Sequence, residues 1–352
     1  MNTYDIPFFF IIGRPRSGTT LLRMLLEAHP NVVIPPESPL ILSLYKKYRK
    51  KTGWSREDME GLFRDIRKQQ YFETWLMDEA ALMREMMTMT GENTFRNILK
   101  KVYLSYVSLY PKDDIRLIGD KNPEYSLYIK RLHKLFPDSK FIYIARDYRD
   151  NYLSLTRVNL EVPVIPLVVY RWKFAYRQFR TLQQKHPSSF YYLKYEDLAA
   201  KPEAQFQRIC EFLGIEFRKD VFGFYKKEAE LKEAYGHSEE LLNIHRSLLK
   251  PVNTGRIGIW KGKMSEKQVR KADLVAGKAA EQAGYERKYR GFSPFLYMWV
   301  MPVLVYARFM YALMLWGERL PYKVRNSLLE VLRIFLKAYW AMNKKKLKQG
   351  KA

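Results

Sequence analysis

The stretch FFFIIGRPRSGTTLLRMLLEA, residues 8–28, decides the fold of this chain. Its first five residues are an apolar run with the length and composition of a buried strand. Residues 13–18 contain the glycine, proline and serine of a turn, and from Thr20 apolar residues recur at helical spacing. Backbone N–H groups of such a turn, together with the start of the helix, can surround an anionic phosphate. The stretch therefore predicts a strand, a phosphate-binding loop and a helix, in that order.

One residue separates this loop from the P-loop of proteins that hydrolyse nucleoside triphosphates. Those proteins carry a lysine after the second glycine, where it reaches the β- and γ-phosphates, and this chain has Thr19 there. Arg16 can supply the missing charge to a donor that has two bridged anionic groups and no γ-phosphate. Two alternatives remain: a nucleotide kinase, which would also need an acidic strand that binds magnesium, and a turn that only caps a helix.

Short apolar runs alternate with helical patterns along the rest of the chain. Strands are predicted at residues 32–34, 117–118, 140–145 and 190–193, and helices at 126–135, from about 149, and at 202–213. Residues 55–110 are predicted to be a largely helical insert. Strands that alternate with helices form a parallel sheet covered on both faces. We therefore predict an α/β fold, with a P-loop-like parallel sheet flanked by helices and an α-helical C-terminal extension.

Composition and charge limit the class of protein and its partners. With 352 residues, 47% of them apolar, the chain can bury a large core, and its formal charge of +25 favours anionic partners. It carries no recognisable nucleic-acid module, so no nucleic acid is expected. The single cysteine, Cys210, lies in a helical pattern that indicates core packing, and residues 1–13 lack the features of a signal peptide. A reducing, cytoplasmic location is therefore expected.

Five sequence blocks carry a resemblance to a known family. The run GRPRSGTTLLRMLLEAHPNV at 13–32, followed by Glu37, resembles the donor-binding opening of sulfotransferases that use 3′-phosphoadenosine 5′-phosphosulfate (PAPS). Matching blocks follow in the family's order: GDKNP at 119–123, SKFIYIARDYRDNYLS at 139–154, KYEDL at 194–198 and KPVN with GRIGIWKGK within 250–263. The likeness covers residues 7–289. It is greatest to the tyrosylprotein sulfotransferases and their bacterial relatives.

The resemblance implies PAPS as the sulfuryl donor and names the residues that hold it. Those expected at the 5′-phosphosulfate are Arg16, Ser17, Gly18, Thr19 and Thr20. Those expected at the 3′-phosphate and the nucleotide are Arg146, Ser154, Tyr195, Arg256, Trp260 and Lys261. Two plainer interpretations stay open from the residues alone: a surface ion pair of Arg146 with Asp147 or Asp150, and simple core packing of Tyr195.

The resemblance also suggests how the transfer is catalysed. Glu37 stands where the family carries its catalytic glutamate, and a carboxylate there can accept the proton of the acceptor hydroxyl. Arg16 and Lys121 are expected to stabilise the charge that grows on the leaving phosphate oxygen. Glu37 and Lys121 each have a plainer interpretation as solvated surface residues. The five histidines lack the spacing of a metal site, so no metal is expected.

The C-terminal region lies beyond the resemblance. Residues 292–316 are almost wholly apolar and aromatic apart from Arg308, residues 328–342 have an amphipathic helical pattern, and five lysines follow within 344–351. We predict two domains, a sulfotransferase domain at 1–290 and a membrane-associated extension at 291–352. Residues 292–316 are expected to form a hairpin or interfacial helix at an anionic membrane surface, on the inner face. Packing on the core, a homodimer contact and transmembrane insertion are the alternatives.

The acceptor is the least determined part of the sequence interpretation. The insert at 55–110 and the C-terminal extension are expected to set its specificity, because the family likeness is weakest there. A lipid or lipid-linked saccharide at the inner leaflet, a saccharide and a tyrosine peptide all present a suitable hydroxyl. A non-enzymatic alternative is an inactive membrane-surface adaptor on the same fold.

Overall fold

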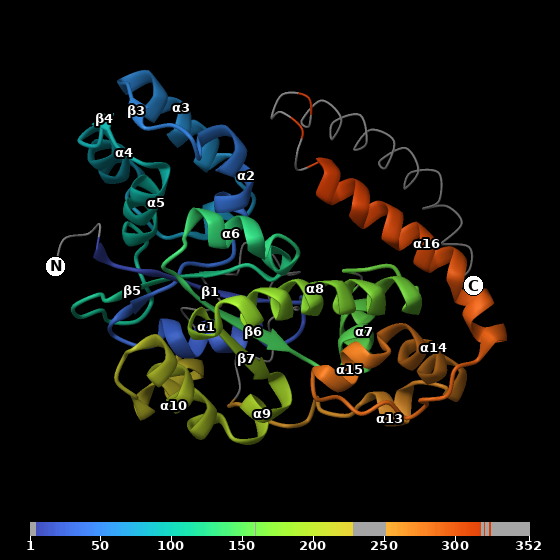
Figure 1. The fold of residues 1–352 in the computed structure, drawn as a ribbon. Helices are drawn as coiled ribbons and strands as arrows, with labels where there is room; N and C mark the ends of the chain where they lie inside the picture. The colour runs from blue at the N-terminus through green and yellow to red at the C-terminus, as the bar shows by residue number, and fades with distance from the viewer. Residues whose placement is uncertain (1–4, 159, 228–250, 318–319, 321–323, 325–352) are drawn as a thin grey trace, which may run out of the picture. The chain divides into compact units, whose positions relative to one another are not determined.

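The computed structural model describes residues 5–158, 160–227 and 251–317, together with Leu320 and Val324 (Figure 1). The chain divides into two compact units, Met1–Val300 and Met301–Ala352. The predicted amphipathic segment at 328–342 and the lysine tail at 344–351 lie outside the described residues.

A five-stranded parallel sheet forms the centre of the first unit, in the order β2-β5-β1-β6-β7. Its strands are β1 (Phe8–Gly13), β2 (Val32–Val33), β5 (Leu117–Lys121), β6 (Lys140–Ala145) and β7 (Phe190–Lys194). The register pairs Ile11 with Lys121, Gly13 with Ile144, and Ala145 with Lys194. Because the strands are parallel, the residues that follow each strand emerge along one edge of the sheet.

Helices connect and cover these strands. Before β6 they are α1 (Thr19–Glu27), α2 (Leu40–Tyr48), α3 (Arg56–Arg67), α4 (Glu79–Met87), α5 (Phe95–Leu104) and α6 (Ile129–Leu135). After β6 they are α7 (Tyr148–Arg157), α8 (Ile165–Lys185), α9 (Tyr195–Ala200), α10 (Pro202–Leu213), α13 (Trp260–Lys263), α14 (Glu266–Ala276), α15 (Lys278–Gln282) and α16 (Pro294–Gly317). Short 3-10 helices are η2 (Phe72–Thr74), η3 (Pro123–Leu127), η4 (Pro187–Ser189) and η5 (Lys219–Lys226).

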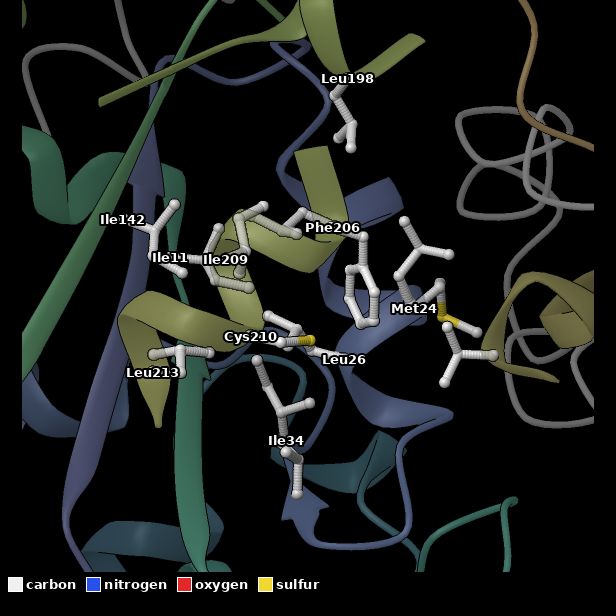
Figure 2. Packing of buried hydrophobic residues seen from close by; sticks show 14 of the residues in the cluster. Ile11, Met24, Leu26, Ile34, Ile142, Leu198, Phe206, Ile209, Cys210 and Leu213 are labelled. Atoms are coloured by element: carbon white, nitrogen blue, oxygen red, sulfur yellow. The ribbon is translucent and has the colours of Figure 1, made fainter. Parts of the chain in front are cut away.

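The two faces of the sheet differ in chemistry because side chains alternate along a strand. On one face, Ile11 and Ile142 pack with residues of α1 and α10 in an aliphatic cluster that includes Cys210 (Figure 2). On the other face the rings of Phe10 and Phe141 stack with centroids 5.1 Å apart. Figure 1 shows α1 and α10 on one side of the sheet and α8 on the other. The buried, free Cys210 agrees with its predicted place in the core.

The predicted elements of the sheet are confirmed, with changes at their ends. Strand β6 and helix α10 begin and end at the predicted residues, and Gly214 closes α10 with a positive φ of 81°. Strand β5 runs further than predicted, to Lys121, because its polar end is buried and paired. Helix α8, 21 residues long, is absent from the sequence prediction.

The insert at 55–110 is largely helical, as predicted, but it contains one additional feature. Strands β3 (Gly53–Trp54) and β4 (Gly91–Glu92) pair as a small antiparallel sheet. Helix α3 begins with a capping box, in which the side chains of Ser55 and Asp58 each accept from the other's backbone N–H.

Helix α16 replaces the alternative of a hairpin at 292–316, because it is continuous from Pro294 to Gly317 with Pro302 inside it. It is the one helix among the described residues that is long and apolar enough to cross a membrane. The same test is also passed by helices of soluble proteins, so length and composition alone decide nothing about a bilayer.

Candidate active site

All five strands of the sheet deliver a predicted site residue to the same edge. The phosphate loop follows β1, Glu37 follows β2, and Lys121 is the last residue of β5. Arg146 comes directly after β6, and Tyr195 directly after β7. Ligands of open α/β sheets bind outside the carboxyl ends of the strands, so this edge is the expected place for a site.

The loop between β1 and α1 is built around two left-handed residues. Arg16 has a φ of 66° and Gly18 a φ of 93°, and Gly18 is the N-cap of α1. A Cβ atom on Gly18 would lie only 2.5 Å from Cδ2 of Tyr195, so only glycine fits beneath that ring. Thr19 is buried and Thr20 is half-buried at the start of the helix.

Four arginines gather around this loop. The pKa of Arg16 is lowered to about 10, first by burial and then by the positive charges of Arg256, Arg146 and Arg157. The pKa of Arg256 is also lowered, by burial and by the charges of Arg157 and Arg146, while Tyr195 opposes the shift. Like charges this close repel one another, and a multivalent anion among them would offset the repulsion, so the cluster is suited to bind such an anion.

Arg146 holds the two loops of the site together. Its guanidinium donates to the backbone oxygens of Arg16 at 3.0 Å and of Arg256 at 2.7 Å, and it lies over the ring of Tyr195. Only 4% of Arg146 is exposed, and its Nε has no hydrogen-bond partner. The alternative of a surface ion pair is therefore wrong for Arg146. Burial also raises the pKa of Tyr195, which packs against Gly18 and the arginine rather than only in the core.

Helix α7 fixes the loop from the other side. Arg16 Nε donates to Ser154 Oγ at 3.3 Å, which brings these two predicted residues together. Asn151 Nδ2 donates to the carbonyl oxygen of Pro15 at 2.8 Å and to Oγ of the buried Ser17 at 3.2 Å. The loop is thus held in shape by side chains of α7.

The segment before α13 reaches the site through Asp150. Its carboxylate accepts from the backbone N–H groups of Gly258 at 2.7 Å and Trp260 at 2.9 Å. The ring of Trp260 is covered by the guanidinium of Arg149, 3.7 Å from its centroid. Lys261 is exposed. Of the three residues predicted in this segment, only Arg256 joins the arginine cluster directly.

Glu37 and Lys121 form an ion pair beside the loop. Lys121 Nζ donates to Glu37 Oε2, with the lysine side chain 3% exposed and the glutamate 36% exposed. The plainer interpretation of Lys121 as a solvated surface residue is therefore wrong. A buried cation next to a half-exposed carboxylate can serve both charge stabilisation and proton transfer.

Three further side chains hold the segment that carries Glu37. Arg23 Nε donates to the carbonyls of residues 34 and 35 at 3.1 and 2.9 Å. Trp75, in the helical insert, donates through Nε1 to the carbonyl of Pro36 at 2.9 Å. Asn122 Nδ2 donates to the carbonyl of Ser38 at 2.7 Å. Glu37 is thus clamped by backbone contacts on both sides.

A buried carboxylate lies behind this pair. Asp120 is 3% exposed and accepts from Tyr103 OH and from Asn122 Nδ2, the latter at 3.3 Å. Burial raises its pKa to about 7, and the negative charge of Glu37 adds to the shift while the two donors and Lys121 oppose it.

Several residues of the site were not predicted. Asn151 and Asp150 lie in the block at 139–154, so their membership in that block was the available signal. Arg157 is one helical turn beyond Ser154, on the same face of α7, and that spacing could have identified it. Nothing in the sequence indicated Trp75. Among the described residues there is no group of three or more His, Cys, Asp or Glu that could hold a metal.

The fold and the site define an α/β protein with a P-loop-like loop and a cluster of arginines at the carboxyl edge of a parallel sheet. A family model described as the sulfotransferase family matches residues 7–219, more than half of the chain. The chain belongs to the sulfotransferase family, which confirms the resemblance carried by the sequence blocks.

Curated relatives agree with this placement. Protein-tyrosine sulfotransferase A of Caenorhabditis elegans is 28% identical over 289 residues, which cover 77% of this chain and 65% of the relative. Protein-tyrosine sulfotransferase 1 of Homo sapiens is 26% identical over 294 residues, which cover 80% of this chain and 70% of the relative. The chain thus spans only about two thirds of the length of these relatives.

Solved structures share the fold. The sulfotransferase domain of the Synechococcus PCC 7002 olefin synthase has a TM-score of 0.56 at 20% identity, covering 80% of this chain and 95% of that domain. The sulfotransferase domain of the curacin biosynthetic pathway has a TM-score of 0.53 at 19% identity, covering 80% and 98%. The predicted fold class is therefore confirmed.

Proposed function

We propose that this protein is a PAPS-dependent sulfotransferase that transfers a sulfuryl group to an acceptor hydroxyl. The observation that carries the proposal is the meeting of an arginine-rich anion site with the Glu37–Lys121 pair at one edge of the sheet. Family membership supports the reaction class. The two features are the ones this reaction needs, a place for a multiply charged donor and a base beside it.

The residues fit the donor that the family implies. The unpartnered Nε of the buried Arg146 and the like-charged cluster around Arg16 both favour an anion. Arg16, Thr19 and the N-terminus of α1 would hold the 5′-phosphosulfate. Arg146 and Ser154 would hold the 3′-phosphate, with the residues of the segment before α13 on the nucleotide.

When bound, PAPS would supply the sulfuryl group, and the bond from its sulfur to the 5′-phosphate oxygen would break as the acceptor oxygen bonds to sulfur. Glu37 would accept the proton of the acceptor hydroxyl, since its carboxylate is the half-exposed member of the pair. Lys121 and Arg16 would neutralise the charge that develops on the phosphate oxygen. Trp75 and Asn122 bind the backbone on either side of Glu37, and these contacts would keep the base in a fixed position.

Two acceptor classes follow from different observations. A tyrosine-bearing peptide follows from the curated relatives, which are named protein-tyrosine sulfotransferases. A lipid or lipid-linked saccharide follows from the exposed apolar surface of α16, which would bring the site to a bilayer. The two classes are tested together by incubating the protein with [³⁵S]PAPS and either a tyrosine peptide or a lipid extract.

A Glu37→Gln variant tests the proposed base. Transfer of label should fall by about 10²- to 10⁴-fold, the usual contribution of general base catalysis, while binding of 3′-phosphoadenosine 5′-phosphate (PAP) is retained. Glu124→Gln, at an exposed position near Lys121 in the sequence, is the matched control and should change neither. Turnover of ATP with magnesium and no PAP binding would instead favour the kinase. A folded protein that binds neither nucleotide would favour the adaptor.

A further inference from the structure

We propose that α16 lies in the plane of an anionic lipid bilayer, with one of its faces inserted among the acyl chains. The helix carries a continuous stripe of exposed apolar residues along its whole length. The stripe includes Phe295, Met298, Trp299, Val305, Phe309 and Trp316, which are between 52% and 72% exposed. Exposed apolar surface of this extent costs free energy in water, and its contiguity distinguishes it from scattered surface residues.

The opposite face of α16 is buried. Val300, Leu304, Ala307 and Tyr311 recur at spacings of three and four residues, and all are buried. The helix therefore has one covered face and one exposed face. A helix that crosses a bilayer alone would expose apolar residues all around, whereas this one presents a single apolar stripe.

Arg308 favours the in-plane arrangement over a membrane-spanning one. It is the fifteenth of 24 residues, so in a spanning helix its guanidinium would lie within the hydrocarbon. It stands one residue after the buried Ala307 and one before the exposed Phe309, which places it about 100° around the axis from each. In an in-plane helix that edge position lets its side chain reach the water.

Charge and composition favour a lipid surface over a second copy of the chain. Lys288 precedes the helix, together with Arg287 and Arg290, which pair with Glu281 and Glu286, and basic residues at 319, 323 and 325 outnumber the single acidic residue at 318 after it in the sequence. With a formal charge of +25, two copies repel each other, while anionic headgroups attract both flanks. Trp299 and Trp316 lie in the exposed stripe, and tryptophan favours the boundary between headgroups and acyl chains, which is where an in-plane helix lies.

Flotation of the full chain, synthesised in a cell-free system with vesicles, tests this placement. Vesicles of phosphatidylcholine with one-fifth phosphatidylglycerol should carry the wild type upward, and vesicles of phosphatidylcholine alone should carry less. A Trp299→Glu/Phe309→Glu variant should float at least roughly tenfold less, because two inserted side chains become charged. The matched control, Leu76→Glu/Val107→Glu, changes two exposed apolar residues outside α16 and should float like the wild type.

The remaining outcomes decide against the proposal in different ways. Alkaline carbonate should release the wild type from the vesicles, and retention would overturn the in-plane placement in favour of a spanning helix. Equal flotation of the Trp299→Glu/Phe309→Glu variant and the wild type would overturn the role of the stripe. If this variant instead dissociated a dimer that the wild type forms without vesicles, a second copy would be the occupant. Limited proteolysis of each product checks that it is folded. Flotation does not depend on the sulfotransferase reaction, so this test is independent of the proposed function.

Discussion

Replacing Asp120 with asparagine should change how the stability of the protein depends on pH. Burial raises the pKa of Asp120 to about 7 from its ordinary 3.8. Between about pH 4 and pH 7 the unfolded chain has therefore lost a proton that the folded chain still holds. The free energy of unfolding falls as the pH rises through this window, and the Asp120 contribution is constant above it. The difference between the two pKa values corresponds to about 4 kcal/mol.

The asparagine amide cannot ionise. The free energy of unfolding of the Asp120→Asn variant, relative to that of the wild type, should therefore rise by about 4 kcal/mol from pH 4 to pH 8. Any loss from altered bonds to Tyr103 and Asn122 shifts the difference by the same amount at every pH. Urea unfolding followed by tryptophan fluorescence, at one-unit intervals of pH, measures the difference directly. Asp138→Asn, at a side chain 73% exposed, is the control and should change the difference with pH by much less, because its ion pair with Arg96 is screened by solvent. If the difference in unfolding free energy between Asp120→Asn and the wild type did not change with pH, the reasoning would be refuted.

Two substitutions test the support of the site. Trp75→Phe removes the bond to the segment before Glu37 and should lower kcat by about 5- to 100-fold, with PAP affinity unchanged, because a buried carbonyl loses its partner. Trp54→Phe removes a comparable indole bond within the insert and should leave kcat unchanged; equal losses in both variants would argue against a specific role. Gly18→Ala should abolish PAP binding in calorimetry, since its Cβ would collide with a tyrosine ring at a φ of 93°. Gly262→Ala, where a Cβ meets no atom within 4 Å, should bind as the wild type does, and tight binding by Gly18→Ala would contradict the geometry.

Much of the sheet could be predicted because its strands are fully buried. Strand β6 has continuous apolar residues between turn signals, and α10 has regular helical spacing closed by Gly214. The extra length of β5 could not be predicted, since Asp120 and Lys121 are polar residues that usually end a buried strand. They are tolerated because Tyr103 and Glu37, distant in the sequence, supply their partners. Helix α8 could have been predicted, because its buried residues recur at helical spacing in the sequence.

The residues expected to bind the donor were easier to predict than the residues that hold them and Glu37 in position. Arg16 and Arg146 lie in blocks that adjoin strands, so a parallel sheet necessarily brings them to one edge. The contacts of Trp75 depend on how the insert folds back onto the segment at 34–38, and no local pattern encodes that. The segment before α13 is positioned by backbone groups that bind Asp150, which side-chain identity at 255–263 does not reveal.

The most direct test of the account is a calorimetric titration of the purified protein with PAP and, separately, with ADP. PAP should bind at least about tenfold more tightly than ADP, because Arg146 and Ser154 would recognise the 3′-phosphate that ADP lacks. Arg146→Ala should remove this preference. Loss of the contact to the 3′-phosphate changes the ratio of the PAP and ADP affinities, whereas a general disturbance of the loops that Arg146 joins would weaken both nucleotides alike. Equal affinities in the wild type, or no binding of either nucleotide, would contradict the assignment of PAPS as donor.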